Sequence, residues 1–106
     1  MIEIERRVTM TIKEYMNDHK VDLDLFTLAL TKAHVDAHPE VKDVRDLYLK
    51  IQYKLGVDVK DLDHEFETLK RITNNYEIPN DVCGTYEKTY HLLKEANRLY
   101  NEGRTV

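Results

Sequence analysis

The stretch 23–37, LDLFTLALTKAHVDA, constrains the fold more than any other part of the chain. Read as a helix, it carries apolar residues over an arc of roughly 160°, whereas a surface helix needs only about 100°. The arc is made by Leu23, Leu25, Phe26, Ala29, Leu30, Ala33 and Ala37. Such a helix needs neighbours on more than one side, so we expect the rest of the chain to pack around it. Pro39 is expected to end it.

Other segments show the spacing of amphipathic helices. They are 11–18, 41–55, 59–75 and 82–101. Thr11 and Glu14 form a capping-box pattern at the start of the first segment. Gly56 follows the second and is expected to be its left-handed C-cap residue, and Asp58 is expected to be the N-cap of the third. Asn80 or Asp81 is expected to cap the last helix.

These segments predict an all-α fold. Short connections between helices favour antiparallel neighbours, so we expect a compact antiparallel bundle of four main helices with a short N-terminal helix in front. A chain of 106 residues fits one domain over residues 1–106. Residues 1–8 alternate in polarity, and the pattern leaves open whether they form a strand or a helical extension.

The composition excludes several kinds of chemistry. The chain has no serine and only three glycines, so it offers neither a serine nucleophile nor a glycine-rich phosphate loop. Cys83 is the only cysteine, which rules out an internal disulfide and fits a reducing, cytoplasmic location. We expect its thiol to be at least half-buried and unreactive, because His91 lies two helical turns away. No apolar run is long enough to span a membrane.

His34 and His38 are the candidate metal ligands. They lie four residues apart in HVDAH, and on one helix this spacing places two imidazoles on the same ion. A third ligand would have to come from Asp61, His64 or Glu95. The alternative explanation is a solvated helix end, where histidines suit the helix dipole.

A second candidate site is a surface for a protein partner. It consists of an acidic run and two tyrosines that lie off or at the edge of their apolar arcs. These residues are Asp61, Asp63, Glu65, Glu67, Tyr53 and Tyr90. The alternatives are an ordinary solvated face for the acids and ordinary bundle edges for the tyrosines.

The sequence therefore predicts a small, non-enzymatic cytoplasmic protein without a cofactor, acting through protein–protein interaction. A regulator, adaptor, or assembly or immunity-type factor of bacterial or phage origin fits this description, with a protein partner or a second copy as its target. The first alternative is a metal-binding bundle that uses His34 and His38. The second is a DNA-binding regulator, which a net charge of −4 and an acidic would-be recognition helix argue against.

Overall fold

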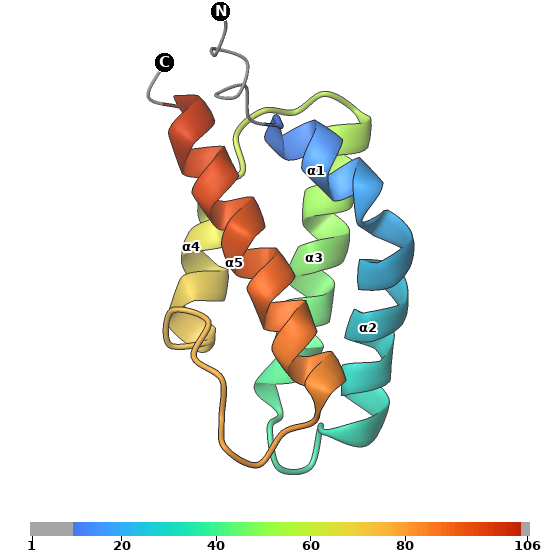
Figure 1. The fold of residues 1–106 in the computed structure, drawn as a ribbon. Helices are drawn as coiled ribbons and strands as arrows, with labels where there is room; N and C mark the ends of the chain where they lie inside the picture. Colours follow the sequence, from blue (N-terminus) through green and yellow to red (C-terminus); the bar gives the residue numbers. More distant parts are fainter. Residues whose placement is uncertain (1–9, 105–106) are drawn as a thin grey trace, which may run out of the picture.

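The computed structural model describes residues 10–104, and within them it confirms the all-α bundle (Figure 1). The five helices of this part are α1 (Ile12–Asp18), α2 (Lys20–Ala33), α3 (Glu40–Gly56), α4 (Asp63–Ile72) and α5 (Gly84–Arg104). The prediction for residues 1–8 falls outside the described residues.

The four longer helices alternate in direction along the chain (Figure 1). The α2 helix packs against α3 and α5, α3 packs against α4, and the short α1 lies against α5 and α2. As a result, the α2–α3 connection and the segment that leads into α5 lie at one end of the bundle. The start of α1 and the end of α5 lie at the other end. None of the described helices is long and apolar enough to cross a membrane.

The α3 helix supplies the central face of the core, as its spacing predicts. Apolar residues three and four apart form one stripe on a helix, and here the whole predicted stripe is buried. Its members are Val41, Val44, Leu47, Tyr48, Ile51 and Leu55. The predicted start of α1 is also confirmed. The Thr11 hydroxyl accepts from the backbone N–H of Glu14, whose carboxylate accepts from the backbone N–H of Thr11.

The prediction for the helix over 23–37 is wrong at its end. The α2 helix stops at Ala33 with His34 as C-cap, and residues 34–38 form the turn that reverses the chain. Pro39 does not end a helix but precedes α3 as its N-cap, at φ −62°. The proline ring fixes φ near that value, which suits a helix start. The predicted helix was too long because the reversal needs the residues that were assigned to its last turn.

The predicted buried face of this helix is confirmed only at Leu23 and Leu30. Only Leu23, Thr27 and Leu30 are buried, whereas Leu25 is 61% exposed. Thr27 is not part of the predicted apolar arc, yet it is fully buried. A threonine is tolerated there because its hydroxyl donates 2.7 Å to the carbonyl oxygen of Leu23. The helix therefore packs through one narrow stripe and lies at the side of the bundle.

The helix predicted over 59–75 is shorter than expected, because α4 begins only at Asp63. Asp58 does not cap it: the residue adopts a left-handed conformation at φ 60° and pairs with Lys13. Gly56 is likewise the last residue of α3 and not a left-handed cap. At the far end, Asn74, Asn75 and Tyr76 all have positive φ and terminate α4. Asparagine tolerates this conformation better than most residues, so Asn74 and Asn75 suit the end of a helix.

Candidate functional site

The candidate site lies at the end of the bundle where two separate connections meet (Figure 1). The first connection is the turn between α2 and α3, which carries His34 and His38. The second is the segment just before α5, which carries Asp81 and Cys83. Because α2 and α5 run in opposite directions and pack together, the end of one lies beside the start of the other.

His34 and Cys83 form the first side-chain pair. The His34 Nε2 atom lies 3.3 Å from the Cys83 Sγ atom. His34 is half-buried and Cys83 is exposed, so solvent reaches the thiol. An imidazole beside a thiol can accept its proton, and this leaves a thiolate, the form of cysteine that binds metals.

His38 and Asp81 form the second pair. The His38 Nε2 atom lies 3.0 Å from Asp81 Oδ1 and 3.2 Å from Oδ2. A carboxylate only accepts, so Nε2 carries the proton of this hydrogen bond. The other ring nitrogen, Nδ1, lies 3.6 Å from Glu40 Oε2. The His38 side chain is 16% exposed and the Asp81 side chain 62%, so the pair extends from the interior to the surface.

Tyr86 packs against both histidines. Its ring packs edge-on against the imidazoles, with centroids 5.3 Å from His34 and 5.5 Å from His38. The Tyr86 hydroxyl donates 3.3 Å to Glu40 Oε2 and is 3.1 Å from the Tyr90 hydroxyl. Burial raises the pKa of both phenols above the ordinary value, so they stay neutral and support the histidines by packing and hydrogen bonding.

The donor set of the two pairs is one that transition metals accept. Imidazole nitrogen, thiolate sulfur and carboxylate oxygen are all ligands of Fe²⁺ and Zn²⁺. Two ligands of one tetrahedral ion lie about 3.3 to 3.8 Å apart, as metal–ligand bonds of about 2.0 to 2.3 Å imply. The separations within each pair come close to this. However, the described residues contain no group of three or more such side chains arranged to hold one ion.

The structure corrects the predicted metal site in two ways, and the expected burial of Cys83 as well. His34 and His38 do not share a helix, because α2 ends before them. The proposed third ligands Asp61 and His64 lie where α4 begins, away from this end (Figure 1). Cys83 is exposed and not buried. Sequence reasoning missed Asp81 and Cys83 as neighbours of the histidines because 43 and 49 residues separate the members of each pair.

The predicted partner surface is not one surface in the structure. Tyr53 is 70% exposed, whereas Tyr90 is 1% exposed and belongs to the core. Tyr90 was expected at the edge of the apolar arc of its helix, but the buried stripe of α5 is wide enough to include it. Among the acids, Asp61 and Glu67 are exposed, but Glu65 is 3% exposed. Its carboxylate pairs with Lys54 at 2.9 Å, and Asp63 accepts a hydrogen bond from Tyr100. Glu65 and Tyr90 are therefore unavailable to a partner.

Comparison with known proteins found similarity to two curated relatives. Both are called Iron-sulfur cluster repair protein ScdA, from two strains of Staphylococcus epidermidis, RP62A and ATCC 12228. Each is 24% identical over 119 residues, which covers 80% of this chain. The chain spans about half the length of these relatives, 53%. No family model and no solved structure matches the chain.

This similarity overturns the main functional prediction. The prediction that this chain acts through protein–protein interaction is wrong as its main function, because the relatives found are named as proteins of iron–sulfur cluster repair. The finding favours the first alternative, a metal-binding helical bundle that uses His34 and His38.

Proposed function

We propose that the chain binds ferrous iron at the end of the bundle and serves iron–sulfur cluster repair. The observation that carries this proposal is the contact of the two pairs, His34 with Cys83 and His38 with Asp81, between segments far apart in sequence. The name of the relatives supports iron as the metal and cluster repair as the setting.

The donor set points to a single iron ion and not to a resident cluster. Iron–sulfur clusters are held by about four cysteine thiolates, and one chain supplies only Cys83. In our proposal, His34 and Cys83 bind the ion directly. His38 and Asp81 join by side-chain rotation or orient it through hydrogen bonds, as carboxylate–histidine pairs do around metals.

The exposure of the site suits transient binding. A structural metal site is closed, with four protein ligands already in place. Here two pairs lie side by side, with an exposed thiol and an exposed carboxylate, so water can complete the coordination. Such an ion exchanges readily, which is what a protein that hands iron to a damaged cluster requires.

The first experiment is an anaerobic titration of the metal-free protein with Fe²⁺, in which calorimetry measures the heat of binding. We expect one ion per chain, and we expect Zn²⁺ to compete because it lies later in the Irving–Williams order. The variants His34→Ala and Cys83→Ala are expected to weaken binding at least tenfold. His91→Ala, which removes an exposed histidine of α5, is the matched control.

Co²⁺ provides a readout of the ligands themselves. A thiolate bound to Co²⁺ gives a sulfur-to-metal charge-transfer absorption, which Cys83→Ala must abolish while His91→Ala retains it. No stoichiometric binding, or binding that His34→Ala and Cys83→Ala leave unchanged, overturns the site.

A separate experiment tests the role in repair. An enzyme whose [4Fe–4S] cluster has lost iron is incubated with iron-loaded protein, sulfide and a thiol reductant, and its activity is followed. We expect recovery to be faster than with the same concentration of free Fe²⁺, and the double variant of His34 and Cys83 to lose this advantage. Iron binding without faster recovery would retain the site and reject the repair role.

A further inference from the structure

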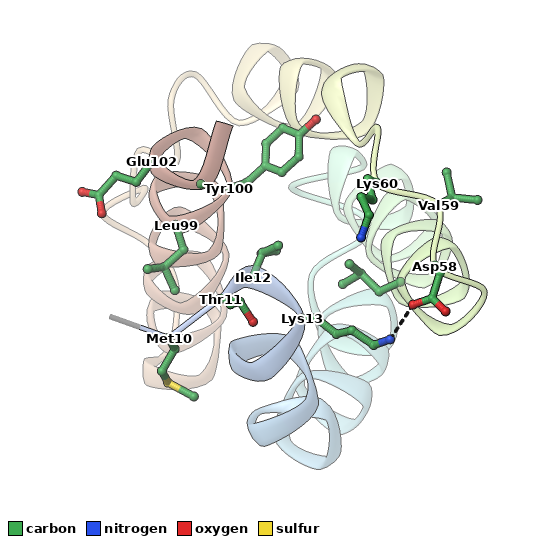
Figure 2. A pocket seen from close by; sticks show the side chains of 12 residues that line it. Met10, Thr11, Ile12, Lys13, Asp58, Val59, Lys60, Leu99, Tyr100 and Glu102 are labelled. Atoms are coloured by element: carbon green, nitrogen blue, oxygen red, sulfur yellow. Dashed lines mark hydrogen bonds and ion pairs between the residues drawn. The ribbon is translucent and has the colours of Figure 1, made fainter. Parts of the chain in front are cut away.

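A cavity of about 670 Å³ lies at the opposite end of the bundle from the histidines and Cys83 (Figures 1 and 2). Small-molecule sites typically have volumes of about 300 to 1,000 Å³. Helix α1, the end of α3 with the loop that follows, and the last turns of α5 enclose it. Its walls are largely apolar, with contributions from Met10, Ile12, Leu55, Leu99 and Tyr100.

Four charged side chains also line this cavity, and three of them have partners of opposite charge. Lys13 Nζ lies 2.7 Å from Asp58 Oδ1, and Figure 2 shows this ion pair at the rim. Glu102 accepts a hydrogen bond from Arg98. Lys60 is different, because it makes no ion pair within residues 10–104. Its ammonium group points into the cavity (Figure 2).

We propose that this cavity binds a single-chain anionic amphiphile, a long-chain fatty acid. The alkyl chain lies against the apolar walls, where each buried methylene strengthens binding. The carboxylate pairs with Lys60, the one charged side chain of the lining that forms no ion pair within residues 10–104. A hollow of this volume receives one molecule, which favours a free fatty acid over the flat surface of a lipid bilayer.

The experiment titrates the full-length chain with a naturally fluorescent fatty acid, cis-parinaric acid, and then displaces it with palmitate. We expect saturable binding at one site per chain. Palmitate is expected to displace the probe, whereas hexadecanol, which lacks the charge, is expected to compete more weakly.

Lys60→Glu tests the ion pair. The variant replaces the ammonium group that pairs with the carboxylate of palmitate by a carboxylate. We expect it to lower the affinity for palmitate roughly tenfold, because a charge-assisted hydrogen bond is lost. The affinity for hexadecanol is expected to stay within about twofold, because the alcohol carries no charge. Lys42→Glu makes the same charge change at an exposed position of α3 near the other end, and it is expected to bind palmitate as the parent does.

Gly103→Leu tests the cavity itself. Gly103 lines the cavity, and a Cβ added there meets no atom within 4 Å, so a side chain can start there without a clash, and we expect a leucine to take up space that the ligand needs. We expect at least a tenfold loss of affinity with unchanged circular dichroism. Gly84→Leu, at the other end of α5, where a Cβ also meets nothing within 4 Å, is the matched control.

Three outcomes overturn the proposal. They are the absence of saturable binding to the full-length chain, equal binding by parent and Gly103→Leu, and binding only to vesicles of anionic phospholipid. Because the two ends of the bundle are tested with different variants, failure here leaves the iron proposal standing, and failure of iron binding leaves this proposal standing.

Discussion

The hydroxyl of Tyr100, near the end of α5, accepts a 2.8 Å hydrogen bond from the backbone N–H of Leu62, just before α4. The same hydroxyl donates 2.6 Å to Asp63 Oδ1. Leu62 is fully buried, so no water can replace the phenol as acceptor. One side chain thus ties α5 to the start of α4.

Tyr100→Phe is therefore expected to destabilise the protein. The substitution leaves the buried N–H of Leu62 without this acceptor, at a cost of about 1–3 kcal/mol. Urea denaturation followed by circular dichroism measures the free energy of unfolding. Tyr53→Phe removes the same atom from a tyrosine that is 70% exposed and serves as the control. Equal stability of the two variants would show that the Tyr100 hydroxyl does not hold α4.

Lys54→Met is expected to destabilise the protein through Glu65. The Glu65 carboxylate pairs with Lys54 Nζ at 2.9 Å, and its second oxygen, Oε1, is buried with no hydrogen-bond partner among the described residues. Removing the lysine leaves a buried charge, which costs about 3–5 kcal/mol when both partners are buried. We expect less, about 1–3 kcal/mol, because the Lys54 side chain is 32% exposed.

A second substitution makes this test specific. Adding Glu65→Gln to Lys54→Met removes the uncompensated charge, so the double variant is expected to be more stable than Lys54→Met alone. Lys50→Met, at an exposed position of the same helix, controls for the loss of a lysine. If Glu65→Gln brings no recovery in the double variant, the Lys54 effect comes from lost packing and not from the stranded charge.

The sequence predicted the fold class, the start of α1 and the buried face of α3. The Thr11–Glu14 capping box and the buried stripe of α3 are confirmed because neighbouring residues decide them. The end of α2 was mispredicted because the chain reversal is set by where α3 must pack. The neighbours of His34 and His38 were missed for the same reason: contacts across 43 to 49 residues leave no periodic signal.

The stability of the protein is expected to fall as the pH rises above 10, because of its buried tyrosines. Burial raises the pKa of Tyr15 and of Tyr76 from 10.0 to about 12. In the unfolded chain these phenols ionise near the ordinary value, about 10. Their contribution to stability is therefore complete below pH 10 and is lost as the pH rises toward 12.

Tyr76→Phe tests this pH dependence. Unfolding free energies of the parent and the variant are measured by urea denaturation from pH 8 to about pH 11, where unfolded tyrosine titrates. At pH 8 the variant is expected to be less stable, because Asn97 Nδ2 donates 2.9 Å to the Tyr76 hydroxyl. Above pH 10 the difference in unfolding free energy between the parent and Tyr76→Phe is expected to shrink, because only the parent loses the contribution of Tyr76. A constant difference across this range would contradict the assignment of the raised pKa to Tyr76.

Thr27→Val is expected to weaken the contact between α2 and α3. The fully buried Thr27 hydroxyl accepts 2.8 Å from Arg45 Nη1 and donates 2.7 Å to the carbonyl oxygen of Leu23. Valine has the same shape but no acceptor, so the half-buried guanidinium loses one partner and keeps its bond of 3.0 Å to the carbonyl oxygen of Asp24. A hydrogen bond to a charged group contributes about 1.5–3 kcal/mol, and we expect a loss at the lower end of that range.

Two further variants separate the hydrogen bond from packing. Thr31→Val removes a hydroxyl that bonds only to the carbonyl oxygen of Leu28 on the same helix, so it is expected to change stability little. Arg45→Met combined with Thr27→Val removes both partners of the hydrogen bond. The loss of unfolding free energy in the double variant is therefore expected to be smaller than the sum of the losses in the two single variants. Strict additivity in this double-mutant cycle would mean that Thr27 and Arg45 do not stabilise each other.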